Sequence, residues 1–303
     1  MKRLAQLWPG AFRSLRWMVM AYKASVSGNS SSLVQSQRCT VSTSSEQFPA
    51  QPAPRPWSLA PEPEPVFGLV AVIFTFVSTL LAIIFCGAIA IVVSRHVVPL
   101  GHIRPVDLAS DPRVIVPAQL AAYLLVFGVL WRMFSHHFQI GFFRALSWNW
   151  PLRWPVFLVG GAVLAMSVLL SSRFLPAPPE LPIDKMMRTP ADAWLLSIFG
   201  VFFAPFVEEV LFRGLLFPAL ARRAGALFSL LMTSVLFGAI HSQQLAGAWI
   251  QVTCIVLVGI VLTVVRWRFR SLASSTLVHV GYNGALFVAL FIQTRGFTNF
   301  TAR

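Results

Sequence analysis

Long runs of residues without a charged side chain dominate this chain from position 66 onward. Each run is close to the ~20 residues that an α-helix needs to cross the hydrocarbon core of a bilayer. The runs are residues 66–94, 114–131, 155–172, 193–220 (with a charged cluster after 207), 224–240, 245–265 and 271–293. We therefore predict an all-α fold, a polytopic membrane helix bundle of about seven spans.

The composition fits a chain that is surrounded largely by lipid. Hydrophobic residues make up 56% of the sequence, charged residues only 11%, and the mean hydropathy is +0.72. Soluble domains carry about 25% charged residues. We therefore expect an integral, multi-pass membrane protein.

The first 65 residues are of a different kind. Residues 2–23 place basic side chains on one side of a possible helix and apolar ones on the other, as interfacial helices do. A Ser/Thr-rich stretch (25–45) and a Pro-rich stretch (49–65) follow, and both predict disordered or extended chain. A targeting peptide is the alternative, but an apolar core with a small-residue cleavage site is missing. We expect a tail over residues 1–65 and a membrane domain over residues 66–295.

The net charge of +14 does not point to nucleic acid, because the basic residues are scattered at the ends of the predicted spans. With seven spans, fifteen Lys and Arg residues fall on the side of the N-terminus and eight on the opposite side. The surplus lies in the tail. We predict a bacterial cell membrane location with the N-terminus inside.

Three charged residues interrupt the fourth run: Glu208, Glu209 and Arg213. At bilayer depth an ionised group costs at least a few kcal/mol unless it is paired or hydrated. Glu209 and Arg213 are four residues apart in the favoured order for a helical ion pair. Glu208 points about 100° away from its neighbour and remains free for another partner. Pro205 should bend this helix, which would admit water.

Two later runs supply histidines in apolar surroundings. His241 ends the segment Phe237-Gly-Ala-Ile-His241, and His279 lies one helical turn before Asn283. A single intramembrane histidine is as often structural as functional. Polar groups from three helices of one bundle instead predict a shared, water-accessible site.

These segments resemble the three motifs of the CAAX protease and bacteriocin-processing family of intramembrane peptidases. The segments are Ala-Pro-Phe-Val-Glu-Glu-Val-Leu-Phe-Arg-Gly (204–214), Phe-x-x-x-His (237–241) and His-x-x-x-Asn (279–283). The resemblance covers about residues 191–293, and the earlier spans are similar only in being hydrophobic. It implies an endopeptidase that cuts a membrane-anchored or lipidated substrate near the bilayer boundary.

The same residues suit peptide hydrolysis, which needs a base for water, donors for the oxyanion and a supporting frame. We assign Glu208 as the general base, with His241 orienting the water. His279 and Asn283 are the expected oxyanion donors, and Glu209 with Arg213 is the supporting pair. The resemblance implies the same division of roles.

A zinc site is the close competitor. His241, His279 and Glu208 would form a His₂Glu set with water in the fourth position, and the family is often described as metalloproteases. The short His-Glu-x-x-His spacing is missing, and Glu209 would then have to act as base while also neutralising Arg213. We therefore favour glutamate-activated water without a cofactor, and keep Zn²⁺ as the alternative.

Two classes without protease activity stay open. A transporter would use the Glu, His and Arg residues as a proton relay, but it predicts internal repeats that this sequence lacks. A catalytically silent scaffold or bacteriocin-immunity protein would bind a peptide in the same cavity with the same residues. The substrate itself, a prenylated C-terminus, a leader peptide or a transmembrane regulator, cannot be read from the sequence.

Glycine and tryptophan residues outside the motifs have simpler interpretations. Gly160, Gly161 and residues 281–284 predict close packing of helices. Trp148, Trp150 and Trp154 predict an aromatic belt at the membrane interface.

Overall fold

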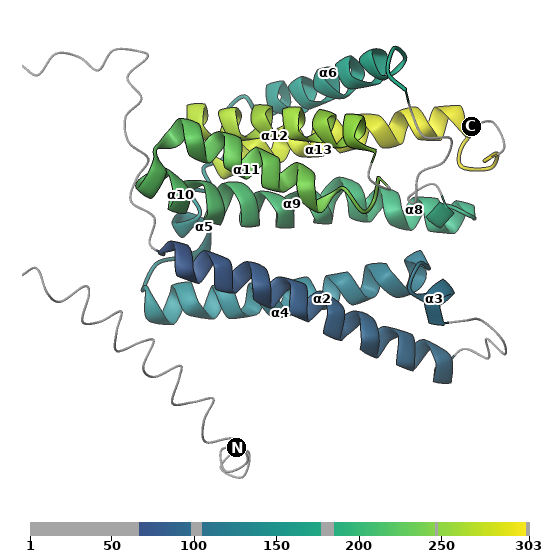
Figure 1. Cartoon of the computed structure of the whole chain (residues 1–303), viewed down its shortest axis with the longest axis horizontal. Helices are drawn as coiled ribbons and strands as arrows, with labels where there is room; N and C mark the ends of the chain where they lie inside the picture. Colours follow the sequence, from purple (N-terminus) through teal and green to yellow (C-terminus); the bar gives the residue numbers. More distant parts are fainter. Residues whose placement is uncertain (1–66, 98–104, 177–184, 246–247, 301–303) are drawn as a thin grey trace, which may run out of the picture. The chain divides into compact units, whose positions relative to one another are not determined.

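A computed structural model describes residues 67–97, 105–176, 185–245 and 248–300, all within one compact unit, Leu59–Arg303 (Figure 1). The predicted tail, residues 1–65, lies outside the described residues. All regular structure in the described part is helical, as predicted. Its helices are α2 (Leu69–Val97), α3 (Pro105–Leu108), α4 (Pro112–Arg132), η1 (Met133–His137), α5 (Phe142–Ala145), α6 (Trp154–Ser172), α8 (Pro190–Ile198), η2 (Phe199–Phe203), α9 (Ala204–Glu209), η3 (Val210–Leu216), α10 (Phe217–Ala224), α11 (Ala226–Ile240), α12 (Trp249–Phe269) and α13 (Leu272–Gln293).

Six helical stretches of the described part are long and apolar enough to cross a membrane. A seventh apolar helix, α11, has only 15 residues. Each of the seven predicted runs corresponds to one of them, so the chain is an integral, multi-pass membrane protein. A helix of 15 residues rises about 22 Å, less than the ~30 Å hydrocarbon core. His241, directly after α11, is therefore expected at bilayer depth.

Local signals in the sequence set where several helices begin. The Asp111 carboxylate accepts a hydrogen bond from the Arg113 N–H at 2.9 Å at the start of α4. Thr189 and Asp192 form a reciprocal capping box at the start of α8, with Pro190 in the first turn. The Ser271 hydroxyl accepts from the Ser274 N–H at the start of α13.

The fourth span is one continuous helical stretch, Pro190–Ala224, with two π-helical segments. η2 ends just before Pro205, and η3 ends just before Pro218. A proline has no N–H to donate to the carbonyl four residues earlier, so the helical ladder must change there. The predicted disturbance at Pro205 is thus found as a π turn, a feature common at functional sites. α9, with both glutamates, lies between the two π segments.

Glycines allow α6 and α13 to pack against each other backbone to backbone (Figure 1). A Cβ on Gly161 would come within 2.0 Å of the Val278 carbonyl oxygen. A Cβ on Gly281 would come within 2.1 Å of the Leu158 carbonyl oxygen. The packing prediction is confirmed for these two glycines. It is wrong for Gly160, which faces open space.

Candidate active site

A fully buried ion pair lies at the centre of the membrane domain. The Arg213 Nη1 donates to Glu209 Oε1 at 3.0 Å, and both side chains have no exposed surface. The predicted pairing of Glu209 with Arg213 is therefore found in the structure.

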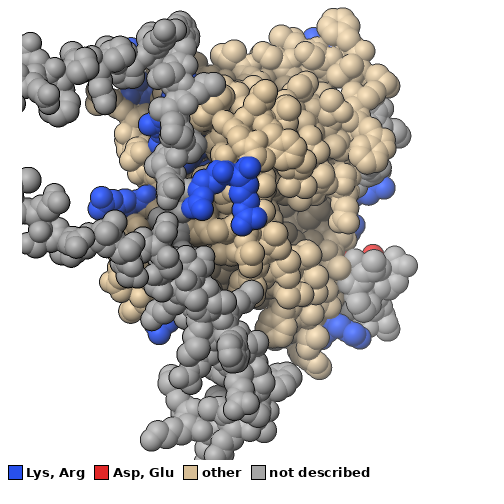
Figure 2. Space-filling view, turned by 60° about the vertical axis from the view of Figure 1, so that its left-hand side comes forward, with Lys and Arg blue, Asp and Glu red and all other residues tan. Residues whose placement is uncertain are grey.

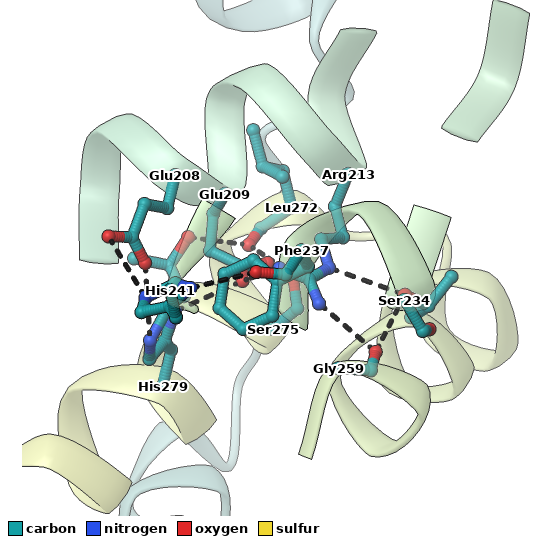
Figure 3. A network of polar contacts seen from close by, with 12 residues as sticks. Glu208, Glu209, Arg213, Ser234, Phe237, His241, Gly259, Leu272, Ser275 and His279 are labelled. Carbon is teal, nitrogen blue, oxygen red and sulfur yellow. Dashed lines mark hydrogen bonds and ion pairs between the residues drawn. The ribbon is translucent and has the colours of Figure 1, made fainter. Parts of the chain in front are cut away.

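Two neighbouring helices hold the arginine in place (Figure 3). Its Nε donates to the Thr263 hydroxyl at 3.3 Å, and its Nη2 donates to the Gly259 carbonyl at 3.0 Å, both on α12. Its guanidinium lies 4.3 Å from the centroid of the Phe237 ring on α11, within cation–π range. Neither Thr263 nor Gly259 was predicted to have a role. A Gly and a Thr four residues apart in an apolar helix were the available signal.

Two histidines approach Glu208 from different helices (Figure 3). His241 Nε2 lies 3.8 Å from Glu208 Oε1, and His279 Nε2 lies 3.7 Å from Glu208 Oε2. The other ring nitrogen of each is engaged: His241 Nδ1 lies 2.7 Å from the Phe237 carbonyl, and His279 Nδ1 lies 3.2 Å from Glu209 Oε1. The structure therefore brings Glu208, Glu209, Arg213, His241 and His279 together.

These partners define which ring nitrogens carry hydrogen. A carbonyl oxygen only accepts, so His241 Nδ1 must be the donor to Phe237. An ionised Glu209 also only accepts, so His279 Nδ1 donates to it. In the neutral rings both Nε2 atoms then carry lone pairs that face the Glu208 carboxylate across 3.7–3.8 Å. The two Nε2 atoms and the Glu208 oxygens are all acceptors, so a hydrogen-bond donor must lie between them. A water molecule or a protonated imidazole can supply it.

The two glutamates differ in access. The side chain of Glu208 is 20% exposed, whereas that of Glu209 is 0% exposed. Only Glu208 can therefore be reached by water or a ligand. The His241 side chain, 3.8 Å from the Glu208 carboxylate, is 16% exposed.

Asn283 lies one turn beyond His279 on α13, but it has a different partner. Its Nδ2 donates to the Gly200 carbonyl in η2 at 2.7 Å. This bond ties α13 to the π turn that precedes α9. Its predicted part as an oxyanion donor stays a prediction, with one amide hydrogen already in use.

Residues 190–285 match the model of the family described as Type II CAAX prenyl endopeptidase Rce1-like. The match begins with α8, includes Glu208, His241, His279 and Asn283, and ends within α13. The predicted resemblance is thereby confirmed, and the family description names prenyl endopeptidases. Comparison with curated proteins and with solved structures gave no match.

The zinc alternative would need three ligands arranged around one position. Over the part of the chain that the structure describes, no group of three or more His, Cys, Asp or Glu side chains is arranged so that it could hold a metal ion. His241, His279 and Glu208 thus form no such group, although the Nδ1 contacts of the two histidines with Phe237 and Glu209 leave both Nε2 atoms free. Whether the protein requires a metal stays a prediction.

An apolar groove of about 470 Å³ lies beside the segment that carries the glutamates. Phe202, Phe203 and Phe206 from η2 and α9 form one wall, and Leu277 and Val280 of α13 form another. Trp148 and Trp150 also line the groove, together with Leu158, Ala273 and Thr276. These two tryptophans, predicted to belong only to an interfacial belt, thus also line a groove.

Proposed function

We propose that the protein is an intramembrane endopeptidase that hydrolyses a peptide bond of a membrane-anchored or lipidated substrate near the bilayer boundary. One observation carries the proposal: the partly exposed Glu208 carboxylate lies between two histidine Nε2 atoms, beside a fully buried Glu209–Arg213 pair. The neighbouring pair is neutral as a whole, so Glu208 is the carboxylate free to take a proton.

The mechanism follows from the acceptors around Glu208. A water molecule in the gap donates one hydrogen to Glu208 and the other to His241 Nε2, which orients its oxygen lone pair toward the substrate carbonyl carbon. As the oxygen attacks, its proton passes to Glu208. The tetrahedral oxyanion then collapses, the C–N bond breaks, and the Glu208 proton passes to the leaving amine.

His279 supports the developing negative charge. In its protonated form Nδ1 donates to Glu209, and Nε2–H becomes a donor for the oxyanion. Arg213 keeps Glu209 ionised and in place through its contacts with α12. These proposed roles are the ones expected from the sequence, except that Asn283, whose amide is bonded to the Gly200 carbonyl, is given no part.

The apolar groove supports a substrate with a lipid or transmembrane segment. Its lining is almost entirely hydrocarbon, with three phenylalanines on the same stretch of helix as Glu208. An apolar chain in this groove would bring the attached peptide to the level of the glutamates. The Rce1-like match agrees, because its family description names prenyl endopeptidases.

A Glu208→Gln variant tests the proposal, because it keeps the shape of the side chain and removes the base. The full chain would be reconstituted in liposomes with a fluorogenic peptide that carries a farnesylated C-terminal cysteine motif. We expect the cleavage rate to fall about 10²–10⁴-fold, the usual contribution of a general base. The membrane peptidomes of cells with either form would then identify natural substrates.

If Glu208→Gln cleaves the peptide at the wild-type rate, Glu208 is not the general base. If no peptide in the cell depends on Glu208 and the Gln variant supports the biological role, the protein is a catalytically silent scaffold or immunity protein and not a peptidase.

A further inference from the structure

A proline leaves one backbone carbonyl of the fourth span without its helical donor. In the π turn η2, the Ala204 N–H donates to the Phe199 carbonyl, five residues earlier. In the same register the Gly200 carbonyl would accept from residue 205, which is a proline and has no N–H. A carbonyl at bilayer depth must find a donor within the protein, because lipid supplies none. The Gly200 carbonyl therefore needs a donor from outside its own helix.

Asn283 of α13 supplies this donor. Its Nδ2 donates to the Gly200 carbonyl at 2.7 Å. The missing side chain at position 200 allows the close approach, because a Cβ there would lie 2.9 Å from Cε2 of Phe287, one turn beyond Asn283. The Asn283 amide thus replaces the backbone N–H that Pro205 lacks.

The same two helical stretches carry the candidate catalytic groups. His279 is one turn before Asn283 on α13; its Nδ1 lies 3.2 Å from Glu209 Oε1 and its Nε2 lies 3.7 Å from Glu208 Oε2. Glu208 is only three residues beyond Pro205. The Asn283–Gly200 bond is therefore a second point at which α13 is fixed relative to the helix with both glutamates.

A third helix, α4, holds the same π turn through stacked rings. Tyr123 stacks on Phe199, with 6.2 Å between the ring centroids and 7° between the ring planes. Phe127 stacks on Phe206 of α9, with 5.5 Å between the ring centroids. These ring contacts supply no donor to the Gly200 carbonyl. Without the Asn283 amide, η2 would keep its packing on α4 and lose its polar bond to α13.

We propose that Asn283 is a positioning residue: its amide takes the place of the hydrogen bond that Pro205 lacks and thereby holds Glu208 at its distance from His279. The inference rests on the proposed peptidase function. It gives Asn283 a role other than the predicted donation to the oxyanion, because the acceptor is a carbonyl of the protein and not an atom of the substrate.

An Asn283→Leu variant removes the amide and keeps the approximate volume of the side chain. With the farnesylated fluorogenic peptide in liposomes, we expect kcat to fall about 100-fold, as for a misplacement of about 1 Å, and KM to stay at its wild-type value. The midpoint of thermal unfolding should fall by about 5 °C, because the Gly200 carbonyl loses its partner. Asn149→Leu is the matched control, since the Asn149 amide also donates to a backbone carbonyl, that of Arg270 at 3.1 Å. Its kcat should be unchanged.

Pro205→Ala separates positioning from donation to the oxyanion, because it restores a backbone N–H at position 205. The Gly200 carbonyl then has a backbone donor, from residue 205 in a π turn or from Ala204 in an α turn. In the Pro205→Ala chain, adding Asn283→Leu should lower kcat by less than about threefold. A lost oxyanion donor cannot be replaced in this way. If Asn283→Leu alone does not fold, the double variant should restore both folding and cleavage.

The inference is overturned by a wild-type kcat for Asn283→Leu, by a rise in KM alone, or by an equal loss in Asn149→Leu. It is also overturned if Asn283→Leu lowers kcat as much in the Pro205→Ala chain as in the wild-type chain, a result that would assign Asn283 to the oxyanion. Failure of the proposed function is a separate result, since it would show as unchanged cleavage by Glu208→Gln. If Glu208→Gln is inactive and Asn283→Leu is fully active, the peptidase stands and only the role of Asn283 is lost.

Discussion

At the residue scale, Glu208 and Glu209 are neighbours in sequence and differ in everything around them. Arg213 and His279 enclose Glu209, whereas two histidine Nε2 atoms and open space face Glu208. The helical spacing of four residues was enough to predict the Glu209–Arg213 pair. The contact of His279 with Glu209 was beyond sequence reasoning, since it depends on where α13 lies relative to α9.

The buried pair predicts a stability defect when either partner is removed. Glu209→Gln or Arg213→Met leaves one charge without its counter-ion in a site with no exposed surface. We expect each variant to lose about 3–5 kcal/mol of unfolding free energy. Thermal unfolding in detergent would measure it.

Two comparisons sharpen this prediction. The double variant should lose less than the sum of the single losses, because no unpaired charge remains. Glu208→Gln should unfold close to the wild-type midpoint. If it is instead the most destabilising change, the roles of the two glutamates are reversed.

Metal content is a second prediction at this scale. With Glu208 as the base, water activation needs no ion. We expect gently purified protein to contain no stoichiometric zinc, and strong chelators to leave cleavage intact. One zinc per chain that disappears in His241→Ala, together with chelator-sensitive cleavage, would favour the His₂Glu site.

At the scale of elements, each predicted apolar run corresponds to a helix. This could be predicted because the length and hydrophobicity of a run are enough to identify a membrane-spanning helix. The boundaries moved by a few residues: the run predicted at 245–265 is the helix Trp249–Phe269. The π segments were not predicted, since Pro205 and Pro218 indicate only that the ladder changes there. Close packing at glycines was predicted for the helices that cross here, α6 and α13. The sequence did not show that Gly161, and not the adjacent Gly160, faces α13.

Gly161 and Gly160 form a matched pair for testing that crossing. Gly161→Ala places a Cβ within 2.0 Å of a backbone carbonyl oxygen, and a backbone cannot move aside as a side chain end can. We expect a loss of about 1–3 kcal/mol from overpacking. Gly160→Ala meets nothing within 4 Å and should stay within about 0.5 kcal/mol of wild type. Equal thermal midpoints for the two variants would contradict the packing of α6 against α13.

At the scale of the whole membrane domain, loops and helix ends lie at the two opposite ends of the helix bundle, called here the level of Ser147 and the opposite level. At one, the Leu272 N–H donates to the Ser147 carbonyl at 3.0 Å, and Asn149 donates to the Arg270 carbonyl at 3.1 Å. At the other, Arg113 pairs with Asp192 at 3.0 Å, and Gln251 donates to the Pro176 carbonyl at 3.0 Å. The sequence predicted this alternation from the order of the spans. It could not predict that α4 lies against η2 and α9, since neither motif nor family match includes α4.

Basic residues are unevenly shared between the two levels. The level of Ser147 includes Arg132, Arg144, Arg153, Arg222, Arg223, Arg266, Arg268 and Arg270, without an Asp or Glu among its described residues. Figure 2 shows Lys and Arg side chains gathered on the face that it brings forward. At the opposite level the described basic residues are Arg95, Arg113, Arg173, Lys185, Arg188 and Arg295, and Arg113 is already paired with Asp192. The level of Ser147, from which α2 begins, should therefore face the cytoplasm.

Cysteine labelling tests this orientation. In a chain whose Cys39, Cys86 and Cys254 are replaced by alanine, Ala224→Cys would report the Arg-rich level and Ala109→Cys the opposite one. Both positions are exposed at helix ends, and both changes are equally small. A membrane-impermeant maleimide should label Ala109→Cys in intact cells and Ala224→Cys only after permeabilisation. The reverse pattern would place the start of α2 on the outer side of the membrane and would contradict the predicted orientation.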